Sequence, residues 1–262
     1  MTAQRALPSA FAGCREKLAS VEAGTYLNHL KAEGDRLAVA AREAGLDAPV
    51  PTCADWDVSA LVAHVAAVYD HKLACMRLQR RPEESEWAHE PPSGRHVVDW
   101  LTDTLADLVA ELRSRGPEAA SYTWYPTDQT VGFWYRRMAN ETAVHRIDAE
   151  LAAGHSTPVD DELALDGIDE MLVAFLAGPW WETDPVPDAS GRTVAVRAGG
   201  ELWRATLEPG AVGVSRSEGR ADATVEGEPS DVLMWLWRRE PARVSVDGDA
   251  VEELQERLAY FT

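Results

Sequence analysis

The stretch Arg136-Arg137-Met138-Ala139-Asn140-Glu141-Thr142-Ala143-Val144-His145-Arg146-Ile147-Asp148-Ala149-Glu150 is the most informative part of this chain. It is predicted to be helical, and Glu141 and His145 are four residues apart, so their side chains lie on one face of the helix. A second apolar helical segment, residues 59–65, carries His64. Two helices of a bundle could join these side chains in a set of two histidines and one carboxylate. Catalytic zinc sites use such three-ligand sets with a vacant fourth position.

Simpler interpretations of the helix pair stay open. A glutamate and a histidine four residues apart are often only a surface pair, and Arg137, four residues before Glu141, fits a ladder of ion pairs. The stretch is not the His-Glu-x-x-His motif of zinc proteases, because Asn140 occupies the first histidine position. A third ligand must therefore come from elsewhere in the chain.

Other candidate residues also have alternative interpretations. His64 could be an ordinary core histidine, and His71, seven residues later on roughly the same helix face, is a less favoured ligand. Cys53 precedes a helix N-terminus, where a thiol can become nucleophilic, although a small buried thiol in a turn is the simpler reading. Three arginines near the predicted site could hold a carboxylate substrate or be exposed helix residues: Arg136, Arg137 and Arg146.

The composition restricts the possible partners. A formal charge of −19 argues against nucleic acid and anionic membranes, since both favour a basic face. The cysteines, Cys14, Cys53 and Cys75, are odd in number and lack Cys-x-x-Cys spacing, so neither a disulfide framework nor a zinc knuckle is predicted. No secretory signal follows Met1, and no apolar run is long enough to span a bilayer. We therefore expect a soluble, cytoplasmic protein.

The hydrophobic pattern predicts two domains of different character. Amphipathic helices over about 22–46, 56–80, 95–115 and 132–153 predict a four-helix bundle within residues 1–157. Residues 158–262 predict a small α+β domain. Its expected helices cover 160–177, a segment capped by Ser230 and a closing segment that opens at Asp249, and its expected strands cover 193–197, 202–207, 212–214, 223–227 and 243–246. Gly199-Gly200 predicts a hairpin between the first two strands. The fold class is thus multidomain, α followed by α+β.

Three segments resemble a known family in the same order along the chain. They are Val50-Pro51-Thr52-Cys53-Ala54-Asp55-Trp56-Asp57-Val58-Ser59-Ala60-Leu61-Val62-Ala63-His64, the stretch 136–150 quoted above, and residues 231–239 continuing to Val246-Asp247-Gly248-Asp249. They are similar to the mycothiol-dependent maleylpyruvate isomerase family. The resemblance implies a DinB-like four-helix bundle followed by a small α+β domain like that of sterol-carrier proteins.

The resemblance also implies a metal site. The family's ligands carry over to His64, Glu141 and His145, with zinc as the usual metal. Two neighbours depart from the family pattern, because Asn140 stands where histidine is common and Ile147 where tryptophan is common. Neither departure removes a ligand.

The expected activity follows from this site. The open metal position would bind and deprotonate a small-molecule thiol, which the resemblance identifies as mycothiol, and the thiolate would attack an electrophilic substrate. If the thiolate adds to a conjugated double bond, the bond rotates and the thiol then leaves, the result is cis–trans isomerisation. If the thiol stays attached, the result is S-transfer. Two alternatives stay open: a non-catalytic binding protein with a structural or vestigial metal, and a metal-dependent hydrolase that activates water. Candidate second-domain residues that could reach the site are Arg220, Arg238 and Arg239.

Overall fold

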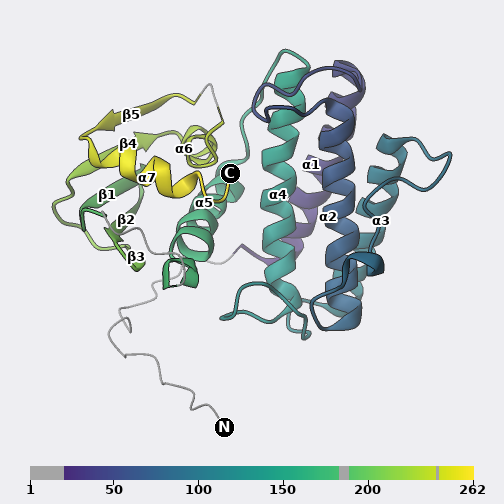
Figure 1. The fold of residues 1–262 in the computed structure, drawn as a ribbon, viewed down its shortest axis with the longest axis horizontal. Helices are drawn as coiled ribbons and strands as arrows, with labels where there is room; N and C mark the ends of the chain where they lie inside the picture. The colour runs from purple at the N-terminus through teal and green to yellow at the C-terminus, as the bar shows by residue number, and fades with distance from the viewer. Residues whose placement is uncertain (1–20, 183–188, 240–241) are drawn as a thin grey trace, which may run out of the picture.

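The computed structural model describes residues 21–182, 189–239 and 242–262, which form a helical bundle beside a smaller domain that contains a β-sheet (Figure 1). Cys14 and the N-terminal segment in which no secretory signal is predicted lie outside the described residues. Within the described part, no helix combines the length and the apolar character that crossing a membrane requires.

Four long helices form the bundle: α1 (Ala23–Ala44), α2 (Val58–Leu78), α3 (Val97–Arg115) and α4 (Val131–Ala152). They match the four predicted helices to within a few residues, so the predicted bundle is confirmed. The tightest packing joins α1 to α4 and α2 to α3. Leucines at helical spacing, including Leu30, Leu37, Leu101 and Leu108, are fully buried in the core between the helices.

Local chemistry sets where α2 begins. Asp57 Oδ1 accepts a hydrogen bond of 2.7 Å from the backbone N–H of Ala60, which satisfies one of the free donors at the helix start. Asp57 is therefore the N-cap of α2. The connection from α2 to α3 contains a short 3₁₀ helix, η2 (Glu84–Glu86).

The second domain begins with helix α5 (Asp161–Asp169), which continues into a turn of π-helix, η3 (Glu170–Leu176), and then the 3₁₀ turn η4 (Pro179–Glu182). Its five-stranded sheet has the order β3-β2-β1-β4-β5. The strands are β1 (Thr193–Ala198), β2 (Glu201–Glu208), β3 (Ala211–Ser215), β4 (Ala223–Gly227) and β5 (Val244–Asp247). Only β1 and β4 are parallel neighbours within this mixed sheet. The predicted α+β domain is confirmed.

The hairpin predicted at Gly199-Gly200 joins β1 to β2. Both glycines have positive φ, +55° and +84°, which a two-residue turn between twisted antiparallel strands requires. The register pairs Val196 with Trp203, and both side chains are buried on the face that the domain's helices cover. Alternate residues such as Arg204 point to the other, partly exposed face.

Helix α6 (Pro229–Leu236) starts earlier than predicted. Its N-cap is Glu228, so Ser230 lies inside the first turn and does not cap the helix. Ser230 Oγ instead accepts a hydrogen bond of 2.9 Å from the backbone N–H of Val159. Proline at the first helical position explains the difference, because its fixed φ favours a helix start there. The closing helix α7 (Ala250–Leu258) follows Asp249, as predicted.

Helix α4 is the bundle helix that faces the second domain (Figure 1). It packs against α1 on one side and α5 on another, and it is buried over most of its surface. Several polar residues of α4 are buried, among them Arg137, Asn140 and Arg146. A buried charge is tolerated when it is paired, so the partners of these side chains decide how the two parts of the chain meet. The predicted boundary between residues 157 and 158 falls in the connection after α4 and stays a prediction.

Candidate metal centre

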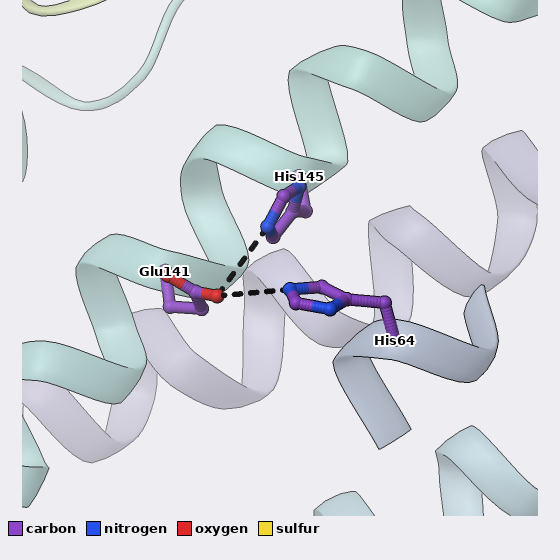
Figure 2. Close-up of side chains that lie close together, drawn as sticks. All are labelled: His64, Glu141 and His145. Carbon is purple, nitrogen blue, oxygen red and sulfur yellow. Dashed lines mark ion pairs between the residues drawn. The ribbon is translucent and has the colours of Figure 1, made fainter. Parts of the chain in front are cut away.

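His64, Glu141 and His145 point toward one another between α2 and α4 (Figure 2). Glu141 Oε1 lies 3.6 Å from His64 Nε2 and 3.3 Å from His145 Nε2. One potential ligand atom from each residue lies within 4.8 Å of the other two. The structure therefore brings together the three side chains that the sequence predicts as metal ligands.

Neighbouring contacts hold the two helices in this register. Tyr69 of α2 and Thr142 of α4 share a hydrogen bond of 2.6 Å beside Glu141, and both residues are buried. Trp56, just before α2, packs against His64 with ring centroids 5.0 Å apart. His64 is thus fixed from its own helix and from the preceding loop, while Glu141 and His145 share one face of α4.

The three side chains differ in exposure. Glu141 and His145 expose 13% and 10% of their side chains, whereas His64 exposes 37%, so the group is reached by solvent from the side of His64. Among the described residues, no fourth histidine, cysteine or carboxylate joins the group. A three-residue ligand set of this kind is typical of catalytic zinc sites, which keep the fourth position for a non-protein ligand.

Asp148 orients His145 from behind. His145 Nδ1 lies 2.9 Å from Asp148 Oδ2, so Nδ1 carries the proton that is donated and Nε2 faces Glu141. Burial opposes the charge on His145, but its hydrogen bonds to Asp148 and Glu141 raise its pKa to about 9 in the metal-free protein. Burial likewise opposes charge on Asp148, yet His145 and Arg239 lower its pKa to about 2.

Arg137 holds the other oxygen of Glu141. Its guanidinium Nη2 donates to Glu141 Oε2, and its Nη1 donates to Glu170 Oε2 at 2.5 Å. Burial would raise the pKa of Glu141, but Arg137 and the two histidines hold it well below the usual value. Burial raises the pKa of Glu170 despite Arg137, and Oε1 of Glu170 has no hydrogen-bond partner among the described residues.

The donor set fits a zinc ion. Two imidazole nitrogens and one carboxylate oxygen are ligands that zinc uses in catalytic sites. Each ligand on α4 is also held by a second residue, as is usual around metals: Asp148 holds His145, and Arg137 holds Glu141. The ion pairs of the predicted ladder, Arg137–Glu141 and Glu141–His145, are both present, but these side chains are largely buried and do not form a surface pair.

Other candidate residues lie outside this group. His71 packs against Trp87, with centroids 4.9 Å apart, and its Nδ1 lies 2.8 Å from Lys72 Nζ. Burial and the neighbouring Lys72 lower the pKa of His71 to about 4. His71 therefore contributes to a separate cluster and is not part of the candidate metal centre.

The three arginines of α4 are not exposed helix residues, because Arg137 and Arg146 are buried and Arg136 is partly buried. Their guanidinium groups are already paired with carboxylates of the protein, which disfavours a role in holding a substrate carboxylate. Arg136 pairs with Asp166 and Asp169, Arg137 with Glu141 and Glu170, and Arg146 with Glu33 and Glu150. Their carboxylate partners come from α1, α5, η3 and α4 itself. Nothing in an isolated helix pattern indicates that both faces will be buried.

Cys53 lies next to the supporting layer of the site. Its Sγ is 3.8 Å from Asp148 Oδ2 and 3.7 Å from Arg239 Nη2. Burial and the charge of Asp148 raise the pKa of its thiol. A raised pKa disfavours the thiolate, so the simpler interpretation of Cys53 as a small packed thiol is preferred.

Arg239 is the second-domain arginine that reaches the site. Its Nε and Nη2 each lie 3.2 Å from an oxygen of Asp148, a two-point contact across the domain boundary. Arg220 and Arg238 are both exposed, whereas Arg239 is buried against Asp148. The sequence alone does not distinguish Arg239 from Arg220 and Arg238. Asp148 has no role predicted from the sequence, although its position three residues after His145 places both side chains on the same helix face.

Of the two departures from the family pattern, Asn140 lies at the domain boundary. Asn140 Nδ2 donates to Asp166 Oδ2 at 3.0 Å, and Asn140 Oδ1 is buried without a partner among the described residues. Ile147 is also buried. Asn140 therefore joins α4 to α5 and is not one of the three converging side chains.

The fold and the site together define a class: a four-helix bundle with a two-histidine, one-carboxylate centre, followed by a domain with a mixed sheet. Residues 27–150 match the sequence profile described as the mycothiol maleylpyruvate isomerase N-terminal domain, and residues 162–252 match the C-terminal domain of the same family. The chain belongs to the mycothiol maleylpyruvate isomerase family.

Two solved structures have a similar fold. They are crystal structures of a mycothiol-dependent maleylpyruvate isomerase and of a variant with one histidine replaced by alanine. Each has a TM-score of 0.56 and 13% identity over 87% of this chain and 93% of the other. Identity this low establishes the shared fold alone. A search of curated proteins gave no match.

Proposed function

We propose that this protein is a zinc-dependent enzyme that uses a low-molecular-weight thiol, mycothiol, to isomerise or conjugate a small electrophilic substrate. The observation that carries the proposal is the convergence of His64 Nε2, Glu141 Oε1 and His145 Nε2 with no fourth protein ligand among the described residues. Family membership supports the choice of thiol, since both matching profiles belong to the mycothiol maleylpyruvate isomerase family.

The chain's own residues would prepare the centre in defined ways. Asp148 accepts the Nδ1 proton of His145 and keeps Nε2 directed at the site. Arg137 engages Oε2 of Glu141 and leaves Oε1 facing the two histidines. Zinc, when bound, lowers the pKa of a thiol at its open position and so supplies a nucleophilic thiolate at neutral pH.

The exposed side of His64 gives the direction of approach for the thiol and its substrate. His64 is the most exposed of the three ligands, and Trp56 flanks it. Glu141 and His145 lie deeper, on the side where Glu170 and Arg239 of the second domain contact Arg137 and Asp148 of α4. We therefore propose that both small molecules reach the centre past His64 and Trp56.

Elemental analysis of tag-free protein tests the centre. About one zinc per chain in the wild type, and its loss in His145→Ala, is expected. Zinc absent from the wild type even after incubation with the metal would overturn the ligand set. The binding-protein interpretation without a catalytic metal would then lead.

A thiol-dependence assay tests the chemistry. With mycothiol present, a cis double bond that becomes trans indicates isomerisation, and a stable thioether indicates S-transfer. Turnover that is unchanged when the thiol is omitted would favour a metal-dependent hydrolase. Zinc bound without turnover under any thiol would favour a structural metal.

A further inference from the structure

Both metal-ligand candidates on α4 are held by residues that the second domain controls. His145 is hydrogen-bonded to Asp148, and Arg239, in the loop after α6, donates two hydrogen bonds to the same carboxylate. Glu141 is held by Arg137, whose remaining contacts also come from the second domain. Two separate chains of contacts therefore connect the second domain to these ligands. Arg239 acts on His145 through Asp148, and Glu170 acts on Glu141 through Arg137.

Arg137 has several further contacts with side chains of the second domain. Its guanidinium carbon lies 5.1 Å from the ring centre of Phe175 and 5.4 Å from that of Trp237. Glu170 provides its second carboxylate. Arg137 is almost fully buried. Phe175, Trp237 and Glu170 therefore fix the position of its guanidinium group.

Glu170 and Phe175, which both contact Arg137, lie in the π-helical turn η3. The turn covers Glu170–Leu176 and begins where α5 ends. Short π-helical turns are rare and are frequently found at functional sites. Oε1 of Glu170 is buried and has no hydrogen-bond partner among the described residues, so the ion pair with Arg137 is the interaction that holds this carboxylate.

We propose that Glu170 is a positioning residue for the metal centre, acting with Phe175 through Arg137 to present one oxygen of Glu141 to the metal. This inference rests on the proposed zinc site. Arg137 pairs with both Glu170 and Glu141. Because Glu170 offsets part of the positive charge of Arg137, the Glu141 carboxylate is less neutralised and binds a metal ion more strongly. Without the Glu170 carboxylate, Arg137 would bind Glu141 more strongly and add an uncompensated positive charge beside the metal.

The test compares Glu170→Gln with Asp169→Asn. Asp169 is the adjacent residue and likewise pairs with an α4 arginine at the domain boundary, but that arginine, Arg136, does not contact a metal-ligand candidate. Zinc affinity, measured by competition with a chromophoric chelator, should fall at least tenfold in Glu170→Gln and stay within about twofold in Asp169→Asn. Equal affinities in wild type and Glu170→Gln would overturn the proposal.

Cobalt provides a readout that a purely structural role would leave unchanged. The visible absorption spectrum of the cobalt-loaded protein reports the ligand arrangement, so it should shift in Glu170→Gln and match the wild type in Asp169→Asn. A weaker affinity with an unaltered cobalt spectrum would contradict a positioning role. If Glu170→Gln does not fold, Phe175→Leu removes one ring contact of Arg137 without burying a lone charge and should weaken zinc binding at least threefold.

The controls separate this inference from the function on which it depends. If the wild type binds no zinc, the proposed metal site fails and the inference fails with it. If the wild type binds zinc, His145→Ala does not, and Glu170→Gln binds as well as the wild type, the metal site stands and only the positioning role is rejected.

Discussion

Asp148 Oδ2 lies 2.9 Å from His145 Nδ1, and the same carboxylate receives two contacts of 3.2 Å from Arg239. One buried carboxylate therefore joins a metal-ligand candidate in the bundle to an arginine of the second domain. We expect Asp148→Asn, which keeps the size of the side chain and removes its charge, to weaken zinc binding about 10- to 100-fold.

Chelator competition checks this prediction, with Asp103→Asn as the control. Asp103 is an exposed residue of α3 and pairs only with Arg95 among the described residues. The control should bind zinc as the wild type does. Wild-type affinity in Asp148→Asn would show that the carboxylate has no influence on His145 as a ligand.

Arg239 is expected to matter for stability as well as for the site. Replacing it with methionine leaves the buried Asp148 with His145 as its one remaining charged partner among the described residues, which costs about 1–3 kcal/mol of unfolding free energy. Arg238→Met is the matched control, because the neighbouring Arg238 is exposed. Urea denaturation should show a lower midpoint for Arg239→Met alone. Identical midpoints for the two variants would mean that the contact with Asp148 contributes nothing.

His71 is expected to make the fold sensitive to acid. Burial and the adjacent Lys72 lower its folded pKa to about 4, below the ordinary value of about 6.5. Its contribution to stability is therefore complete above pH 6.5 and is lost as the pH falls toward 4. After allowance for partial exposure, the wild type should lose about 2 kcal/mol more than His71→Asn between pH 7 and 4.5.

Chemical denaturation at several pH values measures this difference in unfolding free energy. His155→Asn, which replaces an exposed histidine after α4, should follow the wild-type pH profile. A His71→Asn profile parallel to the wild type would show that the histidine titrates normally in the folded protein.

Gly248 is expected to tolerate alanine much less well than Gly45. Both glycines have φ of +85°, so alanine is strained at either position. A Cβ at Gly248 would lie 2.5 Å from the backbone oxygen of Asp222, whereas a Cβ at Gly45 meets no atom within 4 Å. Thermal or urea unfolding should show a cost of about 1–2 kcal/mol for Gly45→Ala and clearly more for Gly248→Ala. Equal costs would mean that the backbone near Asp222 yields readily.

The helices and strands could be predicted because they follow local patterns. Leucines at helical spacing predict α1 and α3, and Gly199-Gly200 predicts the β1–β2 hairpin from two residues alone. His64, Glu141 and His145 could be proposed because two of them share a helix face and all three occupy motif positions. Their meeting within 4.8 Å depends on how α2 and α4 pack, which a single helix pattern does not contain.

The supporting residues could not be predicted in the same way. Glu170 contacts Arg137, and Arg239 contacts Asp148, from a different domain of the chain, so both contacts depend on how the two domains pack together. Arg136 and Arg146 read as exposed residues because local sequence does not reveal that α4 is buried on both sides. Charges that are paired through the tertiary fold look, in the sequence, like charges that face water.

The two-sided burial of α4 has a consequence for cooperativity. This helix belongs to the bundle by sequence, yet Arg136, Arg137 and Asp148 have charge partners in the second domain. Separating the two parts would leave these buried charges uncompensated, so partial unfolding at this boundary is strongly disfavoured. We expect the described helices and sheet to melt in a single calorimetric transition, with two sequence domains behaving as one thermodynamic unit.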